Sequence, residues 1–190
     1  MATRLVLAIR YHASLEEIQE LINAQLDINE VDFYSLTPLK AAMIFYPEVI
    51  PLLMAHPQLD VNKRELDGKT PLFGVAIIGL DLSPFLTHPK IDVNARDKFE
   101  QVALHHAVSS NHPSAIRQFL ADPRTDVSLK TYKGFTVVDM AKRLAPEVLP
   151  LFKREILTLM SPRVVPRLGG TSATRLPTEI MFQLNKMLYM

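Results

Sequence analysis

The 190-residue sequence contains no cysteine and only six glycines. The absence of cysteine excludes a disulfide scaffold, a thiolate metal site and a cysteine nucleophile. Six glycines leave little material for a phosphate-binding loop, and the chain has no P-loop, Gly-x-Gly-x-x-Gly or Gly-x-Ser-x-Gly motif. We therefore expect no cofactor, no catalytic residues and no enzymatic activity.

The chain also lacks a strong excess of either charge and a long hydrophobic run. It has 21 lysines and arginines against 20 acids, a net charge of +1, which argues against a dedicated nucleic-acid binder. Its longest apolar stretch, 75–82, is interrupted and is far short of the roughly 20 residues that span a bilayer. The apolar run 5–9 is too short for a secretory signal. We expect a soluble, cytoplasmic protein that binds neither membrane nor nucleic acid.

Two short phrases recur along the chain in the same rhythm. The first is Thr-Pro-Leu or a variant of it, and its copies begin at Thr3, Thr37, Thr70, Val102 and Thr136. The second is Asp-(Val/Ile)-(Asn/Ser), and its copies begin at Asp27, Asp60, Asp92 and Asp126. Both phrases return at nearly constant intervals, and because two independent phrases keep one phase, the chain is built from repeated structural units.

The repeated residues predict a pair of helices in each unit. Thr37 and Thr70 suit an N-cap, and Pro38 and Pro71 then fall at the first helical position, where a missing N–H costs nothing. Apolar residues at helical spacing follow each such phrase and indicate a second helix. The Asp-Val-Asn phrase closes each unit in a loop.

A period of about 33 residues together with the phrase Thr-Pro-Leu-His-x-Ala is typical of ankyrin repeats. Residues 1–160 resemble an array of five such repeats, at about 1–32, 33–65, 66–98, 99–131 and 132–160. The resemblance implies an all-α fold, a solenoid of helix-turn-helix repeats joined by β-hairpin-like loops, with a short C-terminal helix after it. Residues 161–175 are rich in Pro, Gly, Ser and Thr and are interpreted as a linker to the segment 176–190.

In ankyrin proteins, partners bind the concave side, which is formed by the hairpin tips and the first helices. By alignment, three of the four tips carry an aromatic residue, a type enriched in binding hot spots. The predicted partner-binding residues are Phe33, Tyr34, Leu66, Asp67, Lys98, Phe99, Tyr132 and Lys133. The alternative is that these rings only pack on neighbouring tips. One hypothesis is that four apolar residues on the helices extend this surface, but we expect them to pack in the core: Ile44, Phe45, Ile77 and Ile78.

The C-terminal segment 176–190 resembles the opening of an F-box and the F-box-like ends, called PRANC domains, that follow ankyrin arrays in some viral and bacterial host-directed proteins. The resemblance rests on the residues Leu176, Pro177, Glu179, Ile180, Leu184 and Leu188. It implies docking on the Skp-type adaptor of a cullin-RING ubiquitin ligase, although the chain stops far short of a full F-box. The alternative is a short amphipathic helix that caps the last repeat.

Three smaller predictions concern single residues. Asn29 and Asn94 fit the spacing of ankyrin asparagines that a host oxygenase hydroxylates, although Asn also has a structural reason to stand in this loop. His105 occupies the histidine position of the repeat phrase and is expected to make a structural hydrogen bond. His56 and His88 recur at helix ends and are expected to cap terminal carbonyls. The histidines lack metal-binding spacing, so no metal site is expected.

Together these features predict a protein–protein interaction module that binds a partner on its concave face, either as a host-directed effector or as a ubiquitin-ligase substrate adaptor. A host-directed effector would act in the host-cell cytoplasm. The alternative is a regulatory or inhibitory subunit of an enzyme complex, in which the C-terminal helix only caps the array.

Overall fold

The computed structural model describes residues 4–24, 27–33, 36–65 and 67–153, all within one compact unit that ends at Leu159. These residues form helices and loops and contain no strand, which confirms the all-α prediction for this part of the chain. The helices come in consecutive pairs: α1 (Arg4–Arg10) with α2 (Leu15–Ala24); α3 (Pro38–Phe45) with the 3-10 turn η1 (Pro47–Val49) and α4 (Ile50–Met54); α5 (Pro71–Ile78) with α6 (Ser83–Leu86); α7 (Ala103–Ser109) with α8 (Pro113–Ala121); and α9 (Val137–Leu144) with the 3-10 helix η2 (Pro146–Phe152).

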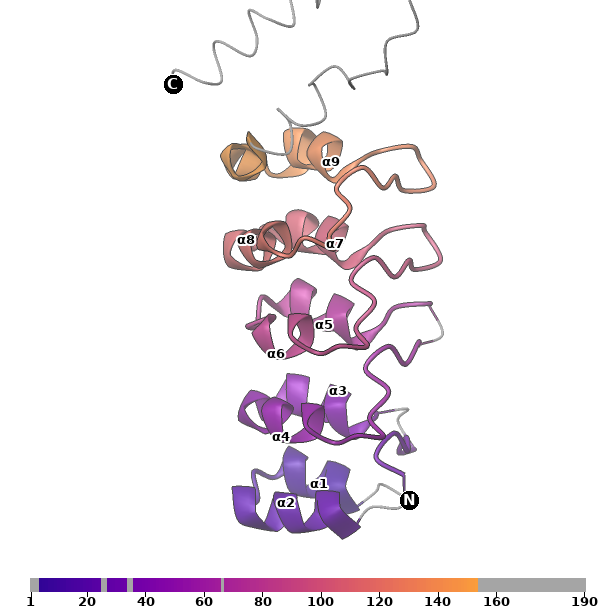
Figure 1. The fold of residues 1–190 in the computed structure, drawn as a ribbon, viewed down its shortest axis with the longest axis vertical. Helices are drawn as coiled ribbons and strands as arrows, with labels where there is room; N and C mark the ends of the chain where they lie inside the picture. The colour runs from indigo at the N-terminus through magenta and orange to yellow at the C-terminus, as the bar shows by residue number, and fades with distance from the viewer. Residues whose placement is uncertain (1–3, 25–26, 34–35, 66, 154–190) are drawn as a thin grey trace, which may run out of the picture. The chain divides into compact units, whose positions relative to one another are not determined.

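Each helix pair forms one layer, and consecutive layers lie one above the other (Figure 1). The first helices of neighbouring layers pack side by side in the order α1, α3, α5, α7 and α9. Between layers the chain extends to one side in segments that we call fingers: 29–37, 62–70, 94–102 and 128–136. Their described residues form irregular loops. The sequence period therefore corresponds to one layer plus one finger.

The first helices begin at the repeated phrase. Thr37 precedes α3, its hydroxyl accepts the Lys40 N–H at 3.1 Å, and Pro38 is the first helical residue. Thr136 and Asp139 form a capping box before α9, with bonds of 3.0 and 3.2 Å. Thr70 also stands at an N-cap, but its buried hydroxyl has no partner among the described residues, so the N-cap hydrogen bond predicted for its side chain is not formed there.

The first helices end in two different ways. In three layers the chain turns at a residue with positive φ, which is His12 (55°), Gly79 (80°) or Asn111 (53°). The next amide then bonds back into the helix, as Leu80 N–H does to the Val75 carbonyl at 3.2 Å. In the layers of α3 and α9 a proline starts the second helical segment directly, Pro47 in one and Pro146 in the other.

A continuous apolar core runs through the layers. The leucine of the repeated phrase is almost fully buried in consecutive layers, at Leu39, Leu72 and Leu104. The second helical segments contribute fully buried phenylalanines, Phe85 and Phe119 among them. Because each layer buries its apolar side chains against its neighbours, no layer has a complete core of its own.

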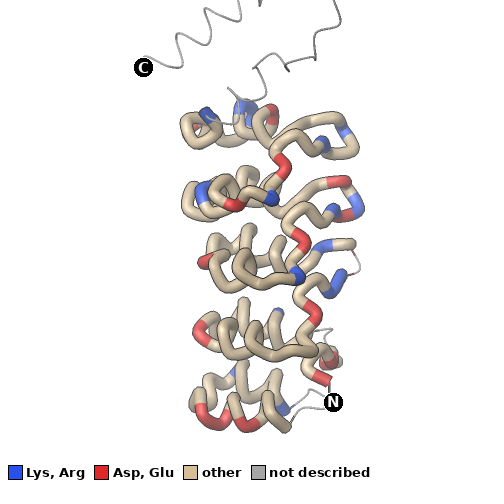
Figure 2. The backbone as a smooth tube through the Cα atoms, viewed as in Figure 1, with Lys and Arg blue, Asp and Glu red and all other residues tan. Residues whose placement is uncertain are grey.

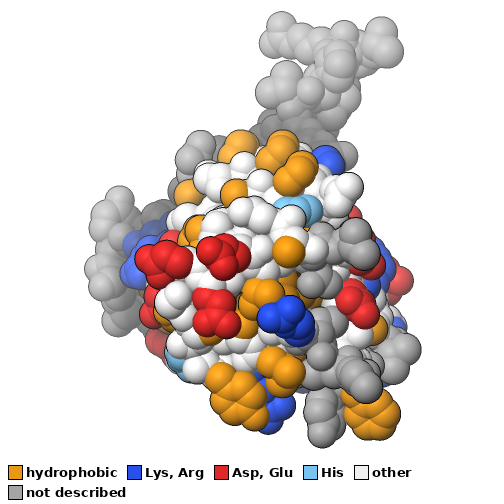
Figure 3. Space-filling view, turned by 90° about the horizontal axis from the view of Figure 1, so that it is seen from below, with side chains coloured by type: hydrophobic (Ala, Val, Ile, Leu, Met, Phe, Trp, Pro, Cys, Tyr) orange, Lys and Arg blue, Asp and Glu red, His pale blue; other side chains and the backbone are white. Residues whose placement is uncertain are grey.

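The first layer exposes both acidic and apolar side chains. Figure 3 views the stack from this end and shows a group of acidic side chains beside scattered hydrophobic ones. Glu16 and Glu17 lie in the first turn of α2, where carboxylates are favoured by the helix dipole. Leu7, Tyr11 and Leu15 are exposed by 39, 75 and 41%.

Candidate functional site

A groove of about 750 Å³ lies between helices α3 and α5 and the fingers 29–37 and 62–70. Ile44 of α3 and Ile77 and Ile78 of α5 line it, with exposed fractions of 50, 37 and 47%. The prediction that these three residues pack in the core is therefore wrong, whereas the half-buried Phe45 does pack against the core. An apolar floor in a concave surface is typical of a binding site.

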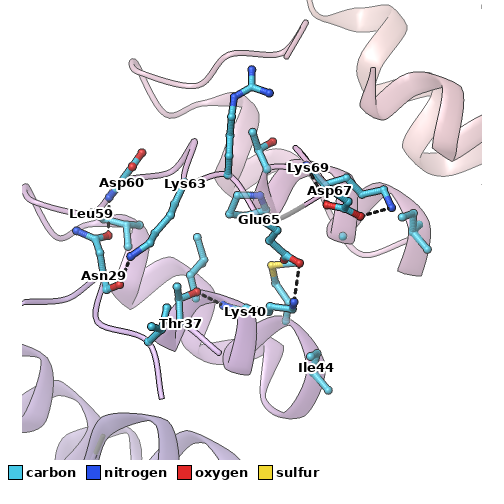
Figure 4. A pocket seen from close by; sticks show the side chains of 18 of the residues that line it. Asn29, Thr37, Lys40, Ile44, Leu59, Asp60, Lys63, Glu65, Asp67 and Lys69 are labelled. Carbon is cyan, nitrogen blue, oxygen red and sulfur yellow. Dashed lines mark hydrogen bonds and ion pairs between the residues drawn. The ribbon is translucent and has the colours of Figure 1, made fainter. Parts of the chain in front are cut away.

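Charged side chains form the wall of the groove (Figure 4). The Lys40 ammonium, which comes from α3, lies 2.8 Å from the Glu65 carboxylate in the finger 62–70. Within the same finger the Lys69 ammonium lies 2.7 Å from the Asp67 carboxylate. The hydrogen bond from Lys69 holds the pKa of Asp67 below its usual value. Asp67, predicted as a partner-binding residue, is thus half-buried and already paired.

Two further cations of the wall bond to neutral acceptors. The Lys63 ammonium donates to the carbonyl of Asn29 at 2.5 Å. The Arg64 guanidinium donates to the carbonyls of Gly68 and Arg96, at 3.0 and 2.6 Å, and so joins one finger to the next. Because carbonyls carry no net charge, these bonds leave both positive charges uncompensated.

Apart from the half-buried Asp67, the predicted tip residues in the described part of the chain are exposed. Phe33, Phe99 and Tyr132 show 84, 43 and 61% of their surface, and Lys98 and Lys133 are also exposed. Tyr34 and Leu66 lie outside the described residues.

The alternative of tip-to-tip packing holds in part. The rings of Phe99 and Tyr132 are 5.9 Å apart, and the ammonium groups of Lys98 and Lys133 lie 5.2 and 5.4 Å from these two rings. The two tips therefore touch one another and still present aromatic and cationic surface.

The asparagines of the second phrase join consecutive layers. The side-chain amide of Asn29 donates to the Gln58 carbonyl and accepts from the Asp60 N–H, both at 2.8 Å. Asn62 makes the same two bonds to Lys90 and Asp92, at 2.7 and 2.9 Å. Asn94 repeats them on Arg124 and Asp126, at 2.8 and 3.0 Å. An amide side chain carries both the donor and the acceptor that these two bonds need. The hydroxylation of Asn29 and Asn94 stays a prediction.

His105 and His106 have different surroundings. His105 is fully buried, and its Nδ1 accepts the Val102 N–H at 3.2 Å, so the predicted structural hydrogen bond is present. Burial lowers the pKa of His105 to about 4. The Nε2 of His106 lies 3.0 Å from the buried Asp97 carboxylate, which also accepts the Phe99 and Gln101 amides at 2.8 and 2.9 Å. Sequence reasoning missed this His–Asp pair, which ties the finger 94–102 to α7.

His56 and His88 do not cap helix carbonyls as predicted. Their Nδ1 atoms instead accept the backbone N–H two residues later, from Gln58 at 3.3 Å and Lys90 at 3.2 Å. Asp122 makes the equivalent bond in the next layer, to the Arg124 N–H at 2.9 Å. Each of these residues precedes a proline and shapes the turn that leads to the Asp-Val-Asn phrase. The residue before this proline therefore needs a side chain that accepts a backbone hydrogen bond, and not one that donates a hydrogen bond.

The remaining sequence predictions concern the C-terminal segments, metal sites and membrane-spanning helices. The linker 161–175 and the six F-box-like residues of 176–190 lie outside the described part of the chain. Among the described residues, no group of three or more His, Cys, Asp or Glu is arranged to hold a metal ion. In the same residues, no helix has the length and apolar character needed to cross a membrane.

Comparison with known proteins finds local similarity. No family model matches the chain. Over 115 residues, 60% of this chain, the sequence is 34% identical to the neurogenic locus notch homolog protein 1 of Xenopus laevis and to that of Homo sapiens. Over 151 residues, 78% of this chain, it is 30% identical to alpha-latrocrustotoxin-Lt1a of Latrodectus tredecimguttatus. The chain spans only 4% of the Notch proteins and 10% of the toxin. Both kinds of relative contain ankyrin repeats, and this similarity indicates a repeat module of the protein-interaction type.

Proposed function

We propose that the chain is an ankyrin-repeat solenoid that binds a partner protein in the groove between α3, α5 and the fingers 29–37 and 62–70. The observation that carries the proposal is the exposed apolar floor of Ile44, Ile77 and Ile78 in a hollow of about 750 Å³. Apolar side chains that converge in a concave, polar-rimmed site mark interaction surfaces. The proposal assigns no catalytic residue and no cofactor to the chain.

The aromatic tips extend this surface. Phe33, Phe99 and Tyr132 project from three fingers and are exposed. Aromatic side chains bury a large area and lose little conformational freedom, and this is why they are common in binding hot spots. We propose that a partner in the groove also contacts these rings.

Affinity capture from cell lysate with matched variants tests the proposal. Ile44→Glu places a charge on the groove floor, whereas Leu15→Glu makes the same kind of change on α2, at a similarly exposed site away from the groove. A fourfold variant changes Phe33, Tyr34, Phe99 and Tyr132 to alanine. We expect one set of proteins to be captured by the wild type and by Leu15→Glu and to be lost with Ile44→Glu.

Circular dichroism of each variant tests whether the fold is kept, and we expect that it is, because the substituted residues that the structure describes are exposed. Loss of the same proteins with the fourfold alanine variant would extend the site to the fingers. Capture that is unchanged by Ile44→Glu would contradict a partner site in the groove.

The C-terminal segment supports a separate proposal, which rests on its sequence alone. Its F-box-like residues, beginning at Leu176 and Pro177, fit either docking to a Skp-type adaptor or the capping of the last repeat. The proposal of adaptor docking includes a cytoplasmic location for the protein. For a secreted effector this location is the host-cell cytoplasm.

A further inference from the structure

The fingers differ in charge along the stack. The finger 29–37 contains two acids, Glu30 and Asp32, and no lysine or arginine. The three fingers 62–70, 94–102 and 128–136 together contain seven lysines and arginines against four acids. Figure 2 shows these cations on the fingers of the upper layers. The near-neutral charge of the whole chain therefore hides a basic edge that begins at the groove.

The four acids of this edge are all engaged within the chain. Glu65 pairs with Lys40 at 2.8 Å and Asp67 with Lys69 at 2.7 Å. Glu100 pairs with Arg96 at 2.5 Å. Asp97 is buried against His106 and against backbone amides. Three of these acids are therefore paired with a cation within the chain, and the fourth, Asp97, is buried.

The remaining cations form no salt bridge with a carboxylate of the described residues. Lys63 and Arg64 bond only to carbonyl oxygens. Lys98 and Lys133 lie over the rings of Phe99 and Tyr132. Arg143 of α9 lies 4.6 Å from the ring centre of Phe135 in the last finger. These arrangements hold the side chains in place and leave their positive charge available.

The cations also recur at one position of the repeat. Arg64, Arg96 and Lys130 occupy the same place in three consecutive fingers, two positions after the residue that ends each Asp-(Val/Ile)-(Asn/Ser) phrase. Neighbouring fingers are tied together by backbone bonds, from the Lys98 N–H to the Asp67 carbonyl at 3.1 Å and from the Tyr132 N–H to the Phe99 carbonyl at 3.0 Å. The basic edge is therefore preorganised, which lowers the entropy lost on binding.

We propose that this basic edge, formed by the fingers 62–70, 94–102 and 128–136, binds an acidic peptide segment of the partner protein. The inference rests on the proposed function and adds the chemistry of the partner to it. Carboxylates of an extended acidic segment pair with the uncompensated cations Arg64, Lys98, Lys130 and Lys133. Lys63 and Arg64 line the groove as well as the edge, so a single partner chain can fill the apolar groove and continue along the basic edge.

The edge fits a peptide better than a nucleic acid. Single-stranded nucleic acids bind by stacking bases on open aromatic faces, but the rings of Phe99 and Tyr132 contact each other and carry lysines over them. The basic surface also ends at the acidic finger 29–37, and the chain as a whole has a net charge of only +1. A short acidic segment needs no more surface than these three fingers offer.

Binding of a fluorescein-labelled dodecaglutamate peptide, measured by fluorescence anisotropy on the full chain, tests the inference. The edge variant carries Lys98→Glu, Lys130→Glu and Lys133→Glu, three exposed residues without side-chain hydrogen bonds in the described structure. The control variant carries Arg4→Glu, Lys90→Glu and Arg117→Glu, which change the net charge equally on other surfaces. We expect the edge variant to bind about tenfold more weakly, as three exposed charge pairs would predict, and the control to bind nearly as the wild type does.

Equal binding by the edge variant and the control, or no binding by the wild type, would overturn the inference. An oligothymidylate of equal length that binds as tightly as the peptide would overturn it in favour of nucleic acid. The groove proposal is judged separately, by capture with Ile44→Glu. Dodecaglutamate binding that depends on the edge, together with capture that is insensitive to Ile44→Glu, would reject the groove and retain the edge.

Discussion

His105 is a buried residue whose protonation opposes folding. Its ring is fully buried, and its Nδ1 accepts the Val102 N–H. Desolvation lowers its pKa from 6.5 to about 4. Between these two pH values the unfolded chain binds a proton at this site and the folded chain does not, so stability rises with pH in this window.

The first prediction follows from this difference. As the pH falls from about 6.5 to about 4, His105 alone is expected to remove about 3 kcal/mol from the free energy of unfolding. The variant His105→Gln keeps an acceptor at the same helix position, where Gln is a natural capping-box residue, but does not titrate. Urea unfolding of both proteins at several pH values measures the effect. The same pH dependence in the wild type and the variant would show that His105 is not responsible.

At the scale of the helix, Gly79 meets two constraints at once. Its φ of 80° is unfavourable for any residue with a Cβ. A Cβ on Gly79 would also lie 2.6 Å from Nδ1 of His112. That ring belongs to the next layer, and its Nε2 lies 2.8 Å from the Ile77 carbonyl near the end of α5. Gly134 has the same φ of 80° but nothing within 4 Å of the Cβ position.

We predict that Gly79→Ala destabilises the protein by about 3 kcal/mol, from backbone strain together with the clash. Gly134→Ala should remove only about 1 kcal/mol, because the backbone term acts alone. Thermal and urea unfolding give both values. Adding His112→Ala to Gly79→Ala should recover part of the loss, and a strictly additive double variant would contradict the proposed clash.

The loops between layers provide a second prediction at this scale. Asn62 bonds to both Lys90 and Asp92 in the next layer, whereas among the described residues Ser128 at the equivalent position bonds to Asp126 in its own loop. Asn62→Ala leaves a backbone donor and a backbone acceptor without their partner and should remove about 2 kcal/mol from the unfolding free energy. Ser128→Ala should remove clearly less, and equal losses would show that the bonds between layers contribute little.

The sequence predicted the helix starts and the loops between layers, because each of these depends on residues close in the chain. Thr37 and Pro38 start α3, and the recurring Asp-Val-Asn phrase places each loop. The groove was harder to predict, because a short helix with apolar side chains all round does not reveal which face is buried. Ile44, Ile77 and Ile78 were therefore assigned to the core. The Asp97–His106 pair joins a finger to a helix, so its formation depends on the fold and leaves no local sequence signal.

At the scale of the whole molecule, the principal contacts between first helices join consecutive layers. The stability of such a stack is close to a sum of layer terms and terms between neighbours. A terminal layer has only one neighbour, so it depends on what covers its outer face. The segment 176–190, which follows the described layers, is predicted from its sequence either to supply such a cover or to bind an adaptor.

Deletion of 176–190 separates these two predictions. A capping segment buries apolar surface of the last repeat, so we expect the deletion to lower the midpoint of thermal unfolding. A substitution of Leu184 and Leu188 by serine in the full-length chain should have the same effect, because both fall on one predicted helix face. Binding of a purified Skp-type adaptor is measured in parallel for all three proteins. An unchanged midpoint together with loss of adaptor binding would contradict the cap and support the F-box-like role, since an adaptor-binding segment need not contribute to the stability of the stack.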